Sequence, residues 1–288
     1  MESVVDMNLA EYTSWRVGGD AKHCFKPKTI AELSDFLKEL PSEEPLLWLG
    51  LGSNLLIRDG GVKETVILTQ GGLNSLMQVD ELTIRAEAGV ACGQLARYCA
   101  RLNLTGLEFL AGIPGTVGGA LAMNAGCHNG ETWEWVQRVE TIDQQGIVRM
   151  RDFSEFKIAY RHVKGPVREW FVAGYFQLKL GNKEQSLLRI KELLDHRART
   201  QPIDFPNCGS VFRNPPGDYA GRLIELCGLK GFSLGKAQVS NKHANFIVNT
   251  GGATAAEIEQ LIEIIMKQVY EKTGISLVRE VHIRGVEK

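Results

Sequence analysis

Apolar residues recur every three or four positions in several stretches of the chain, the spacing of a helix that buries one face. Thr29 with Glu32, and Thr254 with Glu257, are placed as capping boxes at the start of two such stretches. Gly274 follows the second of these stretches, where glycine commonly ends a helix. The pattern therefore predicts helices over residues 30–40, 92–102, 183–199, 219–227 and 254–272.

Short apolar runs bounded by turn residues predict strands between these helices. The runs are residues 21–25, 46–49, 56–57, 66–68, 82–87, 136–142, 147–150, 170–180, 245–248 and 277–283. Residues 201–217 carry no periodic pattern, and irregular segments of this length inside a compact protein are usually functional. Gly181 and Asn182 mark a boundary after which we expect a separate unit.

The bulk composition is that of a soluble protein of two or three domains. The chain has 288 residues, 44% of them hydrophobic and 23% charged, with a net charge of −1. Lys and Arg are scattered, and no apolar stretch approaches the ~20 residues of a membrane helix, so we expect no nucleic-acid or membrane partner. The N-terminus lacks a basic region followed by an apolar stretch, so we expect a cytoplasmic protein without a secretory signal.

The cysteines and histidines do not form a metal-binding or disulfide pattern. No C-x-x-C pair or H-E-x-x-H motif occurs in the sequence, so we expect reduced thiols and no metal. The six cysteines are Cys24, Cys92, Cys99, Cys127, Cys208 and Cys227.

Two glycine-rich stretches are the main candidates for ligand binding. Residues 107–130 hold six glycines and lead into an apolar run, and residues 50–56 read Gly-Leu-Gly-Ser-Asn-Leu-Leu. Glycine lets the backbone approach a ligand closely, and free N–H groups at a helix start favour phosphate. Leu55 stands where a dinucleotide fingerprint has its third glycine, so a Rossmann site is not expected. A packing turn between core elements remains the alternative for residues 107–130, and an Asn/Gly turn remains the alternative for residues 50–56.

Taken together, these loops and four further motifs resemble the UDP-N-acetylenolpyruvoylglucosamine reductase (MurB) family, in its compact subtype. The motifs follow the family's order over almost the whole chain: residues 16–19, 50–56, 112–120, 160–161, 209–215 and 280–281. The family commonly has a serine two residues after the Arg of its Tyr-Arg motif, and here that residue is Val163. This departure puts a local hydrogen bond in doubt and leaves the chemistry unaffected.

The resemblance implies an α+β fold of the vanillyl-alcohol-oxidase-like (PCMH-type) class. Two FAD-binding subdomains, residues 1–69 and 70–181, would precede a C-terminal α+β substrate-binding domain, residues 182–288, whose last strand carries Glu280 back to the active site. FAD would be bound by the two glycine-rich loops, through Gly50, Gly52, Ser53, Asn54, Leu55, Gly112, Ile113, Pro114, Gly115, Gly118 and Gly119.

The resemblance also implies a reaction, the reduction of the enolpyruvyl ether of UDP-N-acetylglucosamine by NADPH through FAD, as a step of peptidoglycan synthesis. Arg161 would stabilise the negative charge that develops beside the substrate carboxylate, because a guanidinium binds a carboxylate as a fork. Glu280 would lie beside that carboxylate, and Ser210 would supply the proton. By residue type alone, Arg161 could be a surface arginine, Ser210 a turn serine and Glu280 a strand-edge charge.

Other assignments are less direct. Candidate contacts to the UDP-sugar are Tyr160, Arg199, Arg213 and Asn214, and the sequence gives no role to Trp133, Trp135 or His282. No fingerprint marks an NADPH site, and we expect a monomer or weak oligomer. An FAD-dependent oxidase of a small alcohol or hydroxy acid on the same fold, and a binding module without catalysis, are the rival functions.

Overall fold

The computed structural model describes residues 4–288, so the first three residues of the expected N-terminal domain lie outside the described residues. The chain forms two compact units, which are described separately below. The first consists of Val4 and residues 24–51 and 65–197, and the second of residues 5–23, 52–64 and 198–288. The division into residues 1–69, 70–181 and 182–288 stays a prediction. No helix of residues 4–288 combines the length and the apolar character that spanning a membrane requires.

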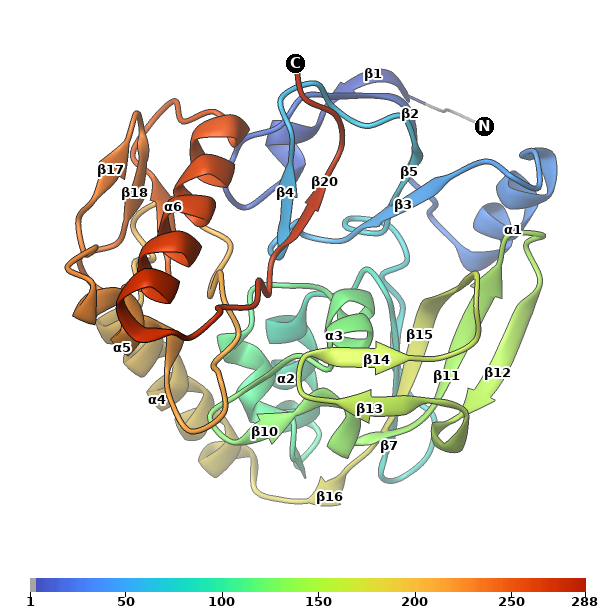
Figure 1. The fold of residues 1–288 in the computed structure, drawn as a ribbon. Helices are drawn as coiled ribbons and strands as arrows, with labels where there is room; N and C mark the ends of the chain where they lie inside the picture. Colours follow the sequence, from blue (N-terminus) through green and yellow to red (C-terminus); the bar gives the residue numbers. More distant parts are fainter. Residues whose placement is uncertain (1–3) are drawn as a thin grey trace. The chain divides into compact units, whose positions relative to one another are not determined.

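Figure 1 shows the elements along the chain. The helices and 3-10 turns are η1 (Leu9–Tyr12), α1 (Ile30–Glu39), α2 (Cys92–Arg101), η2 (Glu108–Gly112), α3 (Val117–Met123), η3 (Thr132–Glu134), η4 (Phe153–Glu155), α4 (Lys183–Thr200), α5 (Ala220–Leu226) and α6 (Ala255–Thr273). The strands up to residue 105 are β1 (Val4–Asn8), β2 (Asp20–Phe25), β3 (Leu46–Leu49), β4 (Leu55–Ile57), β5 (Thr65–Leu68), β6 (Leu76–Gln78), β7 (Thr83–Glu87) and β8 (Leu104–Thr105). The strands that follow are β9 (Gly126–Cys127), β10 (Gly130–Glu131), β11 (Val136–Asp143), β12 (Val148–Asp152), β13 (Lys157–Ala159), β14 (His162–Lys164), β15 (Glu169–Gln177), β16 (Lys179–Leu180), β17 (Ser233–Leu234), β18 (Ala237–Val239), β19 (Ile247–Asn249) and β20 (His282–Arg284).

A small parallel sheet with one helix opens the first unit. β5 pairs in parallel with β3 and with the end of β2, and α1 connects β2 to β3. The Thr29 hydroxyl accepts from the Glu32 N–H at 3.1 Å, which starts α1 as the sequence predicts. Leu33 and Leu37 on the buried face of α1 pack into one cluster with Phe25 and Ile67. The predicted β-α-β unit is confirmed.

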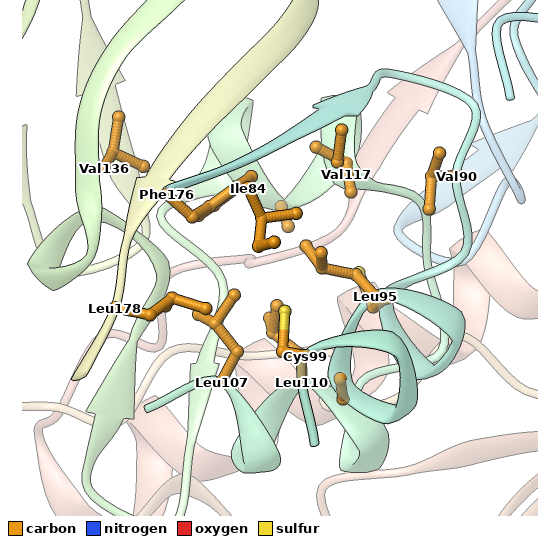
Figure 2. Close-up of a cluster of buried hydrophobic side chains, with 14 of the residues drawn as sticks. Ile84, Val90, Leu95, Cys99, Leu107, Leu110, Val117, Val136, Phe176 and Leu178 are labelled. Carbon is orange, nitrogen blue, oxygen red and sulfur yellow. The ribbon is translucent and has the colours of Figure 1, made fainter. Parts of the chain in front are cut away.

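The larger sheet of the first unit is antiparallel, with strand order β12-β11-β15-β7-β6. The predicted strands at 82–87, 136–142 and 147–150 form β7, β11 and β12, and 170–180 forms β15 and β16. Figure 2 shows the core of this unit, where side chains from the sheet meet those of α2, α3 and η2. The labelled members are Ile84, Val90, Leu95, Cys99, Leu107, Leu110, Val117, Val136, Phe176 and Leu178.

In the second unit, α6 packs against α5 and the antiparallel sheet β17-β18-β19. Its buried stripe includes Ile258, Leu261 and Ile265, and its predicted capping box at Thr254 and Glu257 is present. The last strand is shorter than predicted. β20 covers only His282–Arg284 and pairs in parallel with β4, so Glu280 lies in the extended segment just before it.

Residues of the loop after β4 bind the N-terminal end of α6. Asp59 accepts from the N–H groups of Ala255 and Ala256, each at 2.9 Å, through its two carboxylate oxygens. Arg58 makes a two-point ion pair with Glu259, at 2.8 and 2.7 Å. A helix begins with unsatisfied N–H groups and a partial positive charge, so a carboxylate there is doubly favourable.

We therefore expect Asp59→Ala to lower the free energy of unfolding by about 1–2 kcal/mol, the usual cost of losing a helix N-cap. Urea denaturation followed by circular dichroism measures the change. Asp35→Ala is the matched control, because the Asp35 carboxylate is 62% exposed and pairs only with Lys38, three residues later on α1. Equal effects of the two substitutions would contradict the assignment.

Candidate active site

A cavity of about 420 Å³ lies within the first unit, a volume within the usual range of ligand pockets. Three of the predicted cofactor residues, Gly50, Gly118 and Gly119, line it. The remaining wall comes from β3, β11, β14, β15, α3 and the segments next to β5, β7, β13 and β14: Trp48, Leu49, Thr69, Ala88, Ala122, Thr141, Phe156, Val163, Lys164, Gly165, Pro166, Glu169, Trp170 and Phe171.

Close packing requires glycine at Gly50 and Gly118 of this wall. A Cβ on Gly118 would lie 2.9 Å from the Cβ of Ala88, and a Cβ on Gly50 would collide with the Thr116 hydroxyl. Gly89 is tighter still, because its Cβ would collide with the backbone carbonyls of Gly72 and Thr69. Backbone therefore forms much of the surface around the cavity, as the glycine-rich sequence predicts.

The start of α3 differs from a free anion-binding helix terminus. Residues 115–118 run antiparallel to residues 88–92, through bonds from Cys92 N–H to Gly115 C=O, from Val117 N–H to Val90 C=O and from Gly118 N–H to Ala88 C=O. Two of the first N–H groups of α3 are thus already paired. The glycines here serve close approach of two backbones and the shape of the cavity more than donation from a helix end.

The other predicted cofactor residues do not line this cavity. Gly112, Ile113, Pro114 and Gly115 lie in the same unit, in the segment that leads to α3. Gly52, Ser53, Asn54 and Leu55 belong to the second unit. Gly52 has φ +63°, and a Cβ there would collide with the Tyr12 carbonyl, which explains glycine at this position.

The cavity combines flat apolar walls with polar groups. Trp48 and Trp170 stack with ring centroids 5.4 Å apart. Glu169 accepts from the Thr141 hydroxyl at 2.6 Å and forms a two-point ion pair with Arg151, which holds the pKa of Glu169 below its usual value. The Trp48 indole N–H is buried without a hydrogen-bond partner among the described residues, and so is the Thr116 hydroxyl beside Gly50.

These features fit part of a flavin cofactor. Planar rings suit the apolar walls, and the glycine backbone lets a bulky ligand approach closely. Buried donors without partners are costly unless a ligand uses them. The residues of the first unit that would hold FAD are therefore those of the cavity wall, Gly50, Gly118 and Gly119 among them.

In the second unit, the structure brings Ser210 and Glu280 together. The segment from Ser210 to Arg213 runs antiparallel to residues 278–281, with a bridge between Phe212 and Arg279. The Glu280 N–H donates to the Val211 carbonyl at 2.8 Å. These two residues, far apart in the sequence, thus lie on adjacent extended segments.

Asn54 also makes hydrogen bonds to the segment that carries Glu280. Its side-chain amide donates to the Glu280 carbonyl at 3.1 Å, and its own carbonyl accepts from the His282 N–H at 3.1 Å. Asn54, predicted as a cofactor contact, therefore also has a structural role beside Glu280.

Burial, with the negative charge of nearby Glu280, raises the pKa of the Cys208 thiol well above its usual value.

Arg161 lies in the first unit, at the turn between β13 and β14, with φ +53°. Its guanidinium donates to the carbonyls of Gly126, at 2.5 Å, and Asn124, at 3.4 Å, and lies 5.0 Å from the centre of the Tyr160 ring. A guanidinium has five N–H donors in one plane, and these contacts fix the orientation of that plane.

The remaining candidates divide between exposed and structural positions. The Asn214 side chain accepts from the Ala220 N–H at 3.1 Å and so caps α5, while Arg199 is exposed near the end of α4. Trp133 is a core residue, since it is 3% exposed and its indole N–H donates to the Leu121 carbonyl at 2.7 Å. Lys179 lies over the ring of Trp135, at 5.6 Å from its centre.

Sequence reasoning missed several residues of both sites. Trp48, Trp170 and Glu169 line the cavity, but in the sequence they are ordinary members of strands. Asn245 stands at the predicted start of a strand and makes three hydrogen bonds to Val211 and Phe212 in the Ser210 segment. A buried polar residue between apolar neighbours was the available signal in the sequence.

Comparison with known proteins matches two parts of the chain to known families. Residues 21–151 match the family described as FAD binding domain, and residues 201–284 match the family described as UDP-N-acetylenolpyruvoylglucosamine reductase, C-terminal domain. The UDP-N-acetylenolpyruvoylglucosamine reductase of Legionella pneumophila (strain Corby) is 61% identical over 278 residues, which cover 96% of this chain and 90% of the relative. That of Alkalilimnicola ehrlichii is 58% identical over 277 residues, covering 96% and 93%.

A solved structure supports the same assignment. The crystal structure of UDP-N-acetylenolpyruvylglucosamine reductase (MurB) from Thermus caldophilus superimposes with a TM-score of 0.83 at 35% identity. The match covers 98% of this chain and 99% of that one.

Proposed function

Because the chain belongs to the UDP-N-acetylenolpyruvoylglucosamine reductase family, we propose that it reduces the enolpyruvyl ether of UDP-N-acetylglucosamine with NADPH. The fold is the family's α+β fold, with an FAD-binding domain and the family's C-terminal domain. The product would be UDP-N-acetylmuramate, a precursor of peptidoglycan. NADPH and one proton supply the two hydrogens, and NADP⁺ leaves, so the electrons balance.

The pairing of the Ser210 segment with the Glu280 segment carries this proposal. A hydride that adds to one alkene carbon leaves negative charge on the neighbouring carbon, in conjugation with the substrate carboxylate. A proton donor must then act beside the substrate carboxylate, where Glu280 would also lie. Ser210 and Glu280 come to adjacent positions although 69 residues (211–279) separate them, which a donor and its partner require.

Bound FAD would supply hydride transfer from NADPH to the substrate. The chain's own residues would supply the rest. Arg161 would bind the substrate carboxylate and offset the charge that develops beside it. Ser210 would donate the proton to the carbon next to the carboxylate and regain one from solvent. The Ser210 hydroxyl makes no hydrogen bond with the other described residues, which leaves it available for this donation.

Substrate contacts beyond the reacting group are also part of the proposal. Arg213, Arg199 and Tyr160 would bind the diphosphate and sugar, since guanidinium groups suit phosphate oxygens. Asn214 would donate to these groups through its side-chain amide N–H groups, because its side-chain oxygen caps α5. We further propose a cytoplasmic enzyme that acts as a monomer or weak oligomer.

The test is to purify the protein with its flavin and mix it with NADPH and the UDP-sugar without oxygen. We expect release of FAD on acid precipitation, NADPH consumption that depends on the UDP-sugar, and a product heavier by two hydrogens. An oxidase would instead turn over with oxygen and leave the alkene intact. NADPH oxidation that is independent of the sugar would contradict the proposal.

We expect Arg161→Lys to slow oxidation of the reduced flavin by the UDP-sugar about tenfold or more. Lysine keeps the charge but loses the planar fork, and a hydrogen bond to a charged group is worth about 1.5–3 kcal/mol. Arginine and lysine pay the same conformational cost for the left-handed backbone at position 161. A difference between the wild type and Arg161→Lys therefore reports on the side chain alone. Rapid mixing without oxygen measures the rate.

Arg189→Lys is the control for that substitution. Arg189 is an exposed arginine of α4 that pairs with Glu192 at 3.1 Å. Its replacement should leave both flavin reduction and flavin oxidation unchanged. If Arg161→Lys behaved in the same way, Arg161 would have no part in binding the carboxylate.

A further inference from the structure

Asn245 makes three hydrogen bonds to the backbone next to Ser210, one through its backbone carbonyl and two through its buried side chain. The Asn245 carbonyl accepts from the Val211 N–H at 2.9 Å. The Asn245 side-chain oxygen accepts from the Phe212 N–H at 3.0 Å, and its side-chain amide donates to the Phe212 carbonyl at 2.8 Å. The first of these bonds involves the peptide group that joins Ser210 to Val211.

The remaining backbone polar groups of residues 211–213 form hydrogen bonds with the segment that carries Glu280. The Val211 carbonyl accepts from the Glu280 N–H, and the Arg213 N–H donates to the Val278 carbonyl at 2.9 Å. Val211 and Phe212 are 0% and 1% exposed, so no water replaces these bonds. Every backbone polar group from the Val211 N–H to the Arg213 N–H therefore has a fixed partner, either Asn245 or the segment that carries Glu280.

The orientation of the Asn245 side chain is itself determined. One of its atoms faces an N–H and the other faces a carbonyl, so only the amide in this orientation satisfies both. The Asn245 N–H donates in turn to Nδ1 of His243 at 3.2 Å. Burial lowers the pKa of His243, which favours the neutral ring that this acceptor role needs.

We propose that Asn245 is a positioning residue for the reaction, which fixes the Ser210 hydroxyl beside the Glu280 segment. Its side chain acts through the two backbone polar groups of Phe212, its backbone carbonyl accepts from the Val211 N–H, and the residue is 4% exposed. The inference rests on the proposed function and assigns to Asn245 the rigidity on which proton transfer from Ser210 depends. A donor displaced by a fraction of an ångström transfers its proton more slowly.

The test uses Asn245→Asp in the complete, flavin-loaded protein. Aspartate keeps the acceptor for the Phe212 N–H, but it loses the donor and places negative charge against the Phe212 carbonyl. We expect reduction of the flavin by NADPH to stay within about twofold of wild type. Oxidation of the reduced flavin by the UDP-sugar should slow at least about tenfold, the effect of an unsatisfied buried carbonyl. The ratio of the flavin oxidation rate in H₂O to that in D₂O should rise, because proton transfer from Ser210 becomes the rate-limiting step of this half-reaction.

Asn249→Asp is the matched control. Asn249 is 5% exposed, donates from its side-chain amide to the Trp15 carbonyl at 3.0 Å, and accepts from the N–H groups of Gly251 and Ala253. It thus makes the same kinds of bond in the same unit, away from residues 210–213. We expect it to lower the melting temperature as Asn245→Asp does, with both half-reactions and the solvent isotope ratio unchanged.

If Asn245→Asp yields too little folded protein, Asn245→Ser replaces it, because serine adds no charge and cannot make both bonds to Phe212. A folded, flavin-loaded Asn245 variant with wild-type oxidation by the UDP-sugar and an unchanged isotope ratio would overturn the inference. If the UDP-sugar fails to oxidise the reduced flavin of the wild-type protein, the proposed function is overturned instead, so the two failures are distinguishable.

Discussion

Ser210→Ala is expected to slow oxidation of the reduced flavin by the UDP-sugar about 10²- to 10⁴-fold, the usual contribution of a positioned general acid. Reduction of the flavin by NADPH should stay at the wild-type rate, because that step needs no proton from Ser210. The fold should be unaffected, since the hydroxyl makes no hydrogen bond within the described part of the chain. Rapid-mixing absorbance without oxygen measures the two half-reactions separately.

Ser233→Ala supplies the comparison for that experiment. Ser233 is an exposed serine at the start of β17, in the same unit, and its hydroxyl donates to the Gly231 carbonyl at 3.3 Å and accepts from the Gln238 side-chain amide at 3.0 Å. Its loss should change neither half-reaction. If the UDP-sugar oxidises the reduced flavin of Ser210→Ala at the wild-type rate, Ser210 is not the proton donor.

Gly89→Ala is expected to cost about 1–3 kcal/mol of unfolding free energy and to weaken FAD binding at least about tenfold. The added methyl group would collide with two backbone carbonyls, of Thr69 and Gly72, and neither can move without shifting the end of β5. Thr69 and Ala88 line the cavity, so the shift changes its wall. FAD binding to apoprotein, followed by quenching of flavin fluorescence, measures the affinity.

Gly93→Ala tests whether any added methyl group in this unit has the same effect. Gly93 lies in the first turn of α2, where the nearest atom to its Cβ would be the end of the Arg97 side chain at 3.3 Å, which can move away. Alanine also favours the helix by roughly 1 kcal/mol over glycine. FAD affinity should therefore be unchanged in this variant, and an equal loss in both variants would contradict the role of Gly89.

The sequence predicted most elements because their signals are local. α1 and α6 begin at Thr29 and Thr254, whose hydroxyls cap the first turn in the structure. The last strand was predicted as 277–283, but residues 277–281 pair with the Ser210 segment through only one bridge, and regular pairing begins at His282. A sequence pattern shows that a segment is extended but not which partner it has.

The candidate sites were predictable to a different degree. Motifs pointed to Ser210, Glu280 and the glycine loops, whereas Trp48 and Trp170 reach the cavity from strands that show no sign of ligand binding. Asn245 was missed for the same reason, because its role depends on three hydrogen bonds to a distant segment. Arg161 adopts a left-handed conformation that residue type alone does not predict.

The central claim is that the chain holds a flavin and uses it to reduce an alkene on a UDP-sugar. A single turnover tests it most directly: the flavin is reduced with one equivalent of NADPH without oxygen, and one equivalent of the UDP-sugar is then added. We expect the visible absorption of oxidised flavin to disappear in the first step and to return fully in the second. Absorption that returns only when oxygen is admitted would contradict the central claim.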